Sequence, residues 1–472
     1  MNKNSIIWLR RDLRLYDNAA LFHALKDSNQ VFPVFIFDIK ILSKLKNKKD
    51  RRIEFILRSL DEIKKSLNKK GSDLIVEMGD PESLIPKLIT EYKCKSLYIN
   101  RDYEKYAMDR DNTISEILSS KEVTTFTFKD QVLFENNEIL TQSNNPYTVF
   151  TPYKNNYLKR LNEQGIDLYN CDNHKDSFAT FSHKALPTLE DLTFEKTNLE
   201  DLNLPTGTSG GKELLEKFCN NIKNYSTNRN FPSIRGVSYL SVHNRFGTLS
   251  IRHLAKLAIE ADNDGASTWL NELIWRDFYF QIIANFSQVS EKKSFKSQFE
   301  NLQFENDENK FEAWKNGLTG FPIIDAAMRQ INQTGYMHNR LRMIVSSFLV
   351  KDLLIDWRWG EQYFEDNLID FDFSANNGGW QWAASTGCDS QPYFRIFNPV
   401  LQSEKFDKDG VFIKKYIPQL APLSSKEIHQ PWIYFEKNKD TFPIKLGIDY
   451  PFPIVDHKIQ RDRALSMYKA CK

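Results

Sequence analysis

The sequence has few cysteines, no long apolar run and almost no net charge, and each shortage excludes a class of protein. The five cysteines are odd in number, far apart and without a CxxC pair, which excludes a disulfide framework and a cysteine-based zinc site and indicates buried or idle thiols. No segment approaches the roughly 18 consecutive apolar residues of a membrane-spanning helix. Arginines in the opening MNKNSIIWLRRDLRL occupy the place of a signal peptide's apolar core. We therefore expect a cytoplasmic protein with no membrane partner.

The total charge gives no indication of a nucleic-acid partner, but the tryptophans are unevenly distributed. The 64 lysines and arginines nearly balance the 62 aspartates and glutamates, for a net charge of +2. Any surface for nucleic acid must therefore be a local patch. Seven of the nine tryptophans lie within residues 269–382. A core alone rarely requires such clustering of the largest side chain.

Residues 1–135 alternate strand-like apolar runs with helical patterns. The five strand-like runs are SIIWLR, VFPVFIF, DLIVEM, SLYIN and TTFTF. Between them, RRIEFILRSLDEIKKSLNKKG repeats apolar residues at helical spacing and ends at Gly71. This alternation predicts a doubly wound parallel α/β sheet. Because no GxGxxG motif follows the first run, an ordinary dinucleotide site is not expected there.

The character of the chain changes after the predicted sheet. Residues 136–205 are rich in turn formers, as in NNEILTQSNNP and LPTGTSGG, and predict a long connector with a short helix near TPYKNNYLKRL. Residues 206–472 contain mostly helical periods and few strand-like runs. The predicted fold class is therefore α/β plus all-α, in two domains joined by this connector.

The stretch WLNELIWRDFY places two indoles, a carboxylate and a guanidinium along one helical stripe. These are Trp269, Glu272, Trp275 and Arg276. One interpretation is a buried helix whose acid and base satisfy each other. A purely structural stripe would favour leucine and isoleucine, however, whereas flat rings flanked by charges suit a planar polar ligand.

The stretch RQINQTGYMHNRLRM carries basic residues without an acid. They are Arg329, His338, Arg340 and Arg342. They form either a solvated cationic helix face or the local phosphate-binding surface that the balanced total charge requires.

The stretch DFDFSANNGGWQW combines carboxylates, amides, glycines and indoles. Asp370 and Asp372 could suggest a metal, but the histidine or further oxygen ligands are absent nearby, so we expect no metal site. Hydrogen bonding to sugar hydroxyls or ring N–H groups is the favoured use. Gly378 and Gly379 lack a Cβ, so we expect the backbone to approach a flat ligand there and to turn sharply into the tryptophans.

These motifs together resemble one family over essentially the whole chain. WLRRDLRLYDNAAL, WLNELIWR, GYMHNRLRMIVSSFLVKDLLIDWR, NNGGWQWAAST and PYFRIFNP are similar to those of bacterial class I cyclobutane pyrimidine dimer photolyases, within the photolyase/cryptochrome family. The resemblance implies an N-terminal α/β antenna domain over residues 1–135, an interdomain connector over residues 136–205 and a helical FAD-binding domain over residues 206–472.

The activity implied by the resemblance is that of a deoxyribodipyrimidine photo-lyase, a carbon-carbon lyase that repairs UV-damaged DNA in light. Reduced, anionic FAD excited by blue light donates an electron to a flipped-out cyclobutane dimer, the ring splits, and the electron returns. Because the cofactor supplies the chemistry, the protein needs no nucleophile or base triad. A monomer is expected.

The resemblance also assigns residues to the cofactor. Arg342 is the guanidinium that stacks on the ring, and Asn376 is the amide that accepts a hydrogen bond from flavin N5. The full set of cofactor residues is Tyr225, Val237, Ser238, Tyr239, Leu240, Ser241, Trp269, Arg276, Arg342, Asp370, Phe371, Asp372 and Asn376.

The lesion and the DNA are assigned in the same way. Trp275 and Trp382 match the indoles that line the dimer pocket, and Glu272 matches the acid that hydrogen-bonds a thymine. Asn339 and Met343 complete the wall, and these five residues with Asn376 form the expected catalytic set. The expected DNA contacts are Arg229, Glu272, Trp275, Arg276, Asn339, Arg340, Trp382 and Gln402.

Two departures from the family concern electron supply and light harvesting. Trp380 and Trp357 match the first two members of the tryptophan chain that reduces oxidised flavin, but Phe304 stands where the third is expected, so Trp314 or a tyrosine becomes the candidate donor. Tyr106 and Ala107 replace the Asn and Glu of folate-binding members. A folate antenna is therefore not expected, and a deazaflavin, another flavin or no antenna remain as alternatives.

Two other functions compete with dimer repair. A cryptochrome-type photoreceptor without repair activity commonly loses lesion-pocket residues, which are present here. A 6-4 photoproduct enzyme would place histidines around the lesion, and the only histidine near these motifs is His338, within MHNR. The residues favour repair of cyclobutane dimers over both alternatives.

Overall fold

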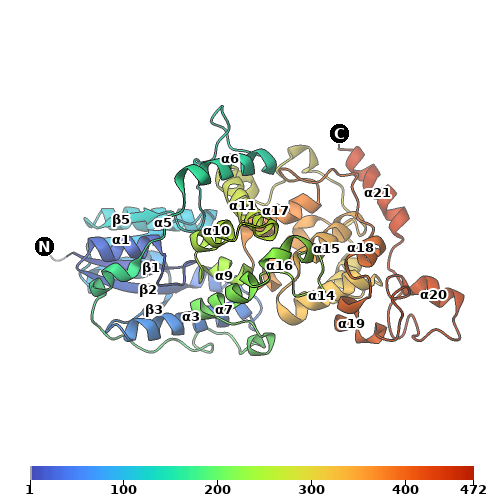
Figure 1. The fold of residues 1–472 in the computed structure, drawn as a ribbon, viewed down its shortest axis with the longest axis horizontal. Helices are drawn as coiled ribbons and strands as arrows, with labels where there is room; N and C mark the ends of the chain where they lie inside the picture. Colours follow the sequence, from blue (N-terminus) through green and yellow to red (C-terminus); the bar gives the residue numbers. More distant parts are fainter. Residues whose placement is uncertain (1–2, 472) are drawn as a thin grey trace. The chain divides into compact units, whose positions relative to one another are not determined.

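The computed structural model describes residues 3–471. Its contacts divide the chain into two compact units, each built from two stretches of sequence. Unit 1 comprises Met1–Lys223 and Ser238–Ser287, and unit 2 comprises Asn224–Val237 and Gln288–Lys472. Figure 1 shows strands and helices alternating in the first part of the chain and helices alone in its second half. The limits predicted at residues 135 and 205 stay predictions.

Unit 1 contains one parallel sheet of five strands, as predicted. The strands are β1 (Asn4–Leu9), β2 (Gln30–Asp38), β3 (Ile75–Gly79), β4 (Ser96–Asn100) and β5 (Thr124–Phe128). Their order is β3-β2-β1-β4-β5, so the chain winds first to one side of β1 and then to the other. Buried on nearly every residue, β1 and β2 show the continuous apolar runs typical of a sheet covered on both faces.

Most of the helices between the strands begin at a polar residue whose side chain accepts a hydrogen bond from the backbone. In α3, Asp50 accepts a hydrogen bond from the backbone N–H of Arg52, and the apolar stripe of the helix is buried at Ile53, Leu60, Ile63 and Leu67. The helices of this region are α1 (Ala19–Asp27), α2 (Ile39–Leu42), α3 (Arg51–Asn68), α4 (Pro81–Glu91) and α5 (Lys105–Ser119).

The rest of unit 1 is helical. The connector contains the predicted helix as α6 (Phe150–Gln164), together with the 3-10 turns η1 (Cys171–Ser177) and η2 (Leu199–Leu202). The later helices are α7 (Gly207–Cys219), α9 (Ser241–Phe246), α10 (Ile251–Glu260) and α11 (Asp264–Asn285). Polar side chains join the N-terminal part of the chain to α10, which lies far from it in the sequence.

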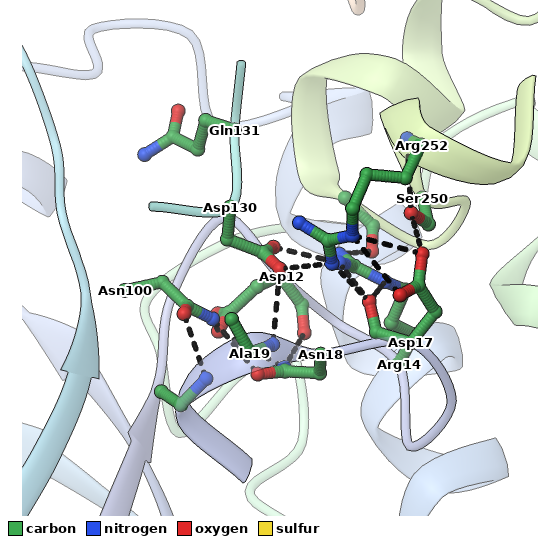
Figure 2. A network of polar contacts seen from close by, with 12 residues as sticks. Asp12, Arg14, Asp17, Asn18, Ala19, Asn100, Asp130, Gln131, Ser250 and Arg252 are labelled. Carbon is green, nitrogen blue, oxygen red and sulfur yellow. Dashed lines mark hydrogen bonds and ion pairs between the residues drawn. The ribbon is translucent and has the colours of Figure 1, made fainter. Parts of the chain in front are cut away.

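A buried network of two arginines and two aspartates makes this connection (Figure 2). Arg14 and Arg252 both contact Asp130, at 2.6 and 2.7 Å, and Arg252 also contacts Asp17 at 3.0 Å. Burial raises the pKa of Asp130, but the two guanidiniums outweigh it and hold the pKa below its usual value. The motif WLRRDLRLYDN therefore builds the interior of unit 1.

Unit 2 is helical, and within residues 3–471 every strand precedes residue 129. Its helices are α8 (Tyr225–Asn228), α13 (Glu308–Asn316), α14 (Pro322–Thr334), α15 (Asn339–Lys351), α16 (Trp357–Asn367), α17 (Phe373–Ala383), α18 (Pro399–Phe406), α19 (Val411–Tyr416), α20 (Pro431–Lys437) and α21 (His457–Lys469). Its shorter turns are η4 (Ser297–Phe299) and η5 (Pro418–Leu420), and η3 (Ile222–Asn224) and α12 (Ser287–Ser290) include residues of both units. Among the described residues, no helix is long and apolar enough to cross a membrane.

Candidate functional site

The stretch ANNGGWQWA forms a continuous helix, which corrects one expectation from the sequence. Asp372 caps α17 by accepting from the backbone N–H groups of Ser374 and Ala375, at 3.1 and 3.4 Å. The helix runs on to Ala383, so no sharp turn occurs at Gly378 and Gly379. Each glycine costs a helix about 1 kcal/mol relative to alanine, and the cap and the burial of neighbouring side chains outweigh that cost.

The helical path of α17 directs its two tryptophans to different sides. Two residues correspond to a rotation of about 200° around a helix. Trp380 is buried against Gly360 of α16, where an added Cβ would lie 2.1 Å from the indole. Trp382 is half-buried and lies 6.5 Å from the ring of Phe397. The two indoles therefore have different surroundings, as their separate assignments require.

Two adjacent asparagines bind the same glutamate of α16 in different ways. Asn376 Nδ2 donates to the backbone carbonyl of Glu361 at 3.1 Å, and Asn377 Nδ2 donates to Glu361 Oε1 at 2.8 Å. Gln381 Nε2 in turn donates to Asn377 Oδ1 at 2.9 Å. Because the protein uses the amide nitrogen of Asn376, the carbonyl oxygen is the end left to accept from a ligand.

Arg342 is held by Asp370 within unit 2. Its Nη2 lies 2.8 and 3.0 Å from the two carboxylate oxygens, and its Nε donates to the carbonyl of Met337 at 2.8 Å. The Asp370 side chain is only 2% exposed. Asp370 therefore fixes the guanidinium, whereas Asp372 uses one oxygen to cap α17. Phe371, between them, is buried.

The basic stretch RQINQTGYMHNRLRM is divided between two helices. Helix α14 ends at Gly335, which has a φ of 67°, and His338 caps α15 by accepting from the backbone N–H of Arg340. Arg329 lies on α14 and contacts Gln419. Burial, followed by the positive charges of Arg340, Arg342 and Arg229, lowers the pKa of His338 to about 4. The stretch therefore does not form a single cationic helix face. With this lowered pKa the His338 ring carries no positive charge at neutral pH.

Several residues assigned to DNA belong to unit 2. Arg340 donates to Asn230 Oδ1 at 2.7 Å and lies 4.5 Å above the ring of Phe406. Burial, and then repulsion from the positive charge of Arg229, lower the pKa of Arg340. A bound anion such as a phosphate would reduce this repulsion between the two guanidiniums. Met343 Sδ lies 3.7 Å from Arg340 Nη1. The side chain of Asn339 is exposed, and that of Gln402, on α18, is half-buried.

The stripe of Trp269, Glu272, Trp275 and Arg276 predicted from the sequence lies on α11, in unit 1. Trp269 is buried and packs edge-on against Phe218 of α7, with ring centroids 4.9 Å apart. Glu272, Trp275 and Arg276 are half-buried. The guanidinium of Arg276 lies 4.7 Å above the ring of Phe280 and donates to the carbonyl of Gln131.

The segment assigned to the cofactor's phosphates has a strained backbone in front of a helix. Tyr239 has a φ of 57°, a left-handed conformation that bulky residues rarely adopt, and α9 begins at Ser241 after Leu240. Such strain is frequent at ligand sites. Tyr225, assigned to the same group, is buried in unit 2 beneath Arg229, whose guanidinium lies 5.5 Å from its ring.

The structure adds residues that the sequence did not indicate. Glu361 of α16 binds both asparagines, and burial raises its pKa. Phe150 stacks on Trp275 from a helix more than a hundred residues earlier. No local pattern signals either contact, because both depend on how distant elements pack.

Two family models match most of the chain. Residues 5–170 match the model described as DNA photolyase, and residues 269–470 match the FAD binding domain of DNA photolyase. The deoxyribodipyrimidine photo-lyase of Escherichia coli strain K12 is 38% identical over 478 residues, which cover 99% of this chain and 98% of the relative.

Solved structures of photolyases have the same fold. A class III photolyase from Agrobacterium tumefaciens superposes with a TM-score of 0.90 at 34% identity, covering 100% of this chain and 98% of the other. An archaeal photolyase from Sulfolobus tokodaii, described with two FAD molecules, gives a TM-score of 0.79 at 32% identity and covers 99% of this chain and all of the other.

Proposed function

Because the chain belongs to the DNA photolyase family, we propose that it repairs UV-damaged DNA in light, by splitting cyclobutane pyrimidine dimers with bound FAD. The observation that carries this proposal is the match along nearly the whole chain to a deoxyribodipyrimidine photo-lyase. The arrangement of Asn376 and Arg342 supports it. Relatives from Escherichia coli, Vibrio cholerae and Salmonella typhimurium are all named deoxyribodipyrimidine photo-lyase, which favours repair over a cryptochrome-type function.

The residues of unit 2 fit a flavin ring. An isoalloxazine presents N–H groups, carbonyl oxygens and an aromatic face, and the chain offers an amide acceptor at Asn376 and a fixed guanidinium at Arg342. When bound, FAD supplies the light absorption and the electron. We propose that Asn376 Oδ1 accepts from flavin N5–H and that Asp370 holds Arg342 against the ring.

The proposed contacts with the lesion are aromatic and polar. Trp275 and Trp382 offer surfaces on which a base can stack, worth roughly 1 to 3 kcal/mol per base, which offsets the few kcal/mol of flipping. Glu272 accepts from a thymine N–H, while Asn339 and Met343 complete the wall. Arg229, Arg340 and Gln402 contact the damaged strand without reading its sequence.

In the proposed electron supply Trp380 reduces the flavin and is itself reduced by Trp314. The two rings meet edge-on with centroids 6.2 Å apart. In the resemblance Trp357 is the next donor, but the guanidinium of Arg358 lies 4.7 Å above its ring and disfavours a positive hole there. Beyond Trp357 the resemblance leads to Phe304, which is a poor donor.

Tyr363 is the proposed end of the Trp314 branch. Its ring lies 5.6 Å from that of Trp314, and its phenol donates to Asn332 Oδ1. Burial raises the pKa of this phenol to about 12, so it is protonated at neutral pH. Tyr363 therefore passes one electron to the oxidised ring of Trp314 and its phenol proton to solvent, and an external thiol later returns one electron and one proton to Tyr363.

For the antenna, the two residues that stand where folate-binding members carry Asn and Glu have other contacts. Tyr106 donates to Asp38 Oδ2 at 2.7 Å, and Ala107 is buried in α5. Neither presents a carboxylate or amide to a pterin. We propose a flavin or deazaflavin as the second chromophore, if the chain binds one. From the resemblance of its motifs to class I photolyases, we also propose that the protein is a class I enzyme. We propose that it works as a monomer and acts at the nucleoid.

The test is repair of a defined dimer. The FAD-loaded protein, reduced in the dark, is mixed with an oligonucleotide that contains one thymine dimer and exposed to blue light. Restored thymines, measured by chromatography, are the expected result, and a dark sample is the control. A protein that keeps reduced FAD and yet restores no thymine contradicts the proposal.

A further inference from the structure

The indole of Trp275 is covered on one face by a phenyl ring from the connector. Phe150, the first residue of α6, lies with its ring centroid 3.7 Å from that of Trp275 and its plane tilted by only 8°. At that separation the two rings are in van der Waals contact over their faces. Phe150 is 7% exposed, whereas Trp275 is half-buried. A ligand base can therefore reach only the other face or the edges of the indole.

Other rings prevent the stacked pair from tilting. Phe278 of α11 meets Phe150 and Trp275 nearly at right angles, with centroids 5.7 and 5.6 Å away. Tyr153 packs against Phe278 from α6, and Tyr279 lies 5.5 Å from Trp275. Edge-to-face and stacked contacts on several sides leave the indole one orientation.

Polar groups of α11 fasten the connector in the position that this stack needs. Asp277, Gln281 and Asn285 recur every four residues along one side of the helix. Asp277 Oδ2 accepts from Tyr157 Oη at 2.8 Å and from the backbone N–H of Leu133 at 2.9 Å.

Gln281 and Asn285 bind the backbone of the first residues of the connector. Gln281 Nε2 donates to the carbonyl of Tyr147 at 2.8 Å, and Asn285 Nδ2 donates to that of Asn136 at 3.2 Å. Three hydrogen-bonding residues on a single stripe therefore place the first turn of α6, and with it Phe150, against Trp275.

We propose that Phe150 is a positioning residue that holds the Trp275 indole in the orientation for contacting a pyrimidine dimer. The inference rests on the function proposed for Trp275. It gives the predicted connector, which lies within unit 1, a part in recognising the lesion. Because the indole is already ordered before the DNA arrives, binding does not have to immobilise it.

The test compares dark affinities of the FAD-loaded protein for two oligonucleotides, one with a thymine dimer and one undamaged. Phe150→Leu should weaken binding of the dimer about threefold to tenfold, the range of one aromatic pair, and leave undamaged DNA unchanged. Phe150→Tyr, which keeps the ring, should bind like the parent. Phe134→Leu is the matched control, because Phe134 packs on Tyr157 of the same helix.

A second variant and a double mutant make the result specific. Phe150→Met removes the ring with less loss of volume and should reproduce the effect of Phe150→Leu. In a Trp275→Ala background, Phe150→Leu should add nothing, because the indole that it positions is gone. With 5-fluorotryptophan in the protein, the fluorine resonance of Trp275, assigned by Trp275→Phe, should move when the stacked phenyl is removed.

The outcomes separate this inference from the function on which it rests. If Trp275→Ala weakens dimer binding and the ring-removing variants do not, the positioning role is wrong and the role of Trp275 stands. If Phe150→Leu weakens both oligonucleotides equally, the effect is general and the positioning role is also wrong. If Trp275→Ala has no effect on dimer binding, the assignment of Trp275 to the lesion fails first.

Discussion

Single residues in unit 2 carry roles that depend on one partner each. Arg342 is held by a carboxylate that is itself almost completely buried, so the pair works as a unit. Removing one member leaves a charge inside the protein without compensation, which costs about 3–5 kcal/mol when the pair is fully buried. The partner is therefore as important for the cofactor site as the residue that faces the ligand.

We predict that Arg342→Gln lowers the flavin content of the purified protein severalfold, measured by the absorbance ratio at 450 and 280 nm. The variant loses the guanidinium that faces the ring and leaves Asp370 unpaired. The double variant with Asp370→Asn should recover stability but not flavin, because it removes only the orphaned charge. Arg329→Gln, on α14, is the control and should keep full flavin content. Full occupancy in Arg342→Gln would refute the assignment.

The electron route makes a second prediction at single residues. Trp314→Phe should slow light-driven flavin reduction in the presence of a thiol by about tenfold, the factor that 1.4 kcal/mol of barrier produces. Adding Phe304→Trp should restore part of the rate, because it completes the branch through Trp357, where Arg358 still disfavours the hole. Trp432→Phe, remote from Trp380 in sequence, serves as the control. Dimer repair by protein reduced beforehand should not change, and an unaltered rate in Trp314→Phe would exclude this branch.

At the scale of elements, helix α17 shows what periodicity can and cannot predict. All five strands and the connector helix follow from apolar spacing and turn residues, which act within a few positions. The two glycines before Trp380 suggested a turn, but Asp372 and the packing on α16 keep the segment helical. Two contacts could not be predicted from the sequence, because each forms only when distant segments meet. One is the stacking of Phe150 on Trp275, and the other is the ion pairing of Asp130 with Arg14 and Arg252.

Two glycines on α16 and α17 should respond oppositely to alanine. Gly360→Ala places a Cβ against the Trp380 indole and should cost about 1–3 kcal/mol through overpacking. Gly379→Ala meets no atom within 4 Å and should stabilise α17 by about 0.5–1 kcal/mol. Urea unfolding followed by far-UV circular dichroism measures both values. Destabilisation by both substitutions would mean that the glycines are needed for another reason.

At the scale of the whole molecule, each unit contains a histidine whose burial links its stability to pH. In unit 1, His243 is fully buried and its Nδ1 lies 2.7 Å from Thr248 Oγ1. Burial lowers its pKa to about 4, the same value as for His338 in unit 2. The ordinary pKa of histidine is 6.5 in both cases. Both rings are therefore neutral in the folded protein at pH 6, where the unfolded chain is largely protonated.

The sign of the effect follows from proton uptake. Between pH 6.5 and 4 the unfolded chain binds more protons at these two sites, so the free energy of unfolding falls as the pH falls. The contribution of the two neutral histidines to the free energy of unfolding is complete above pH 6.5. By pH 4 that free energy has fallen by about 3 kcal/mol for each histidine. Asp277 and Asp352 act in the opposite direction, because burial raises their pKa to about 6 and the folded state takes up their protons first.

Because these contributions oppose each other, single variants reveal the histidines better than the parent's own pH profile. We predict that His243→Gln and His338→Gln each flatten the decline in unfolding free energy between pH 6.5 and 4.5, measured by urea unfolding. Any cost of repacking glutamine appears equally at pH 7.5 and can be subtracted there. Asp352→Asn should steepen the decline instead, since it removes a group that stabilises the fold on protonation. If the slopes of the histidine variants equal that of the parent, these rings are not the groups that destabilise the molecule in acid.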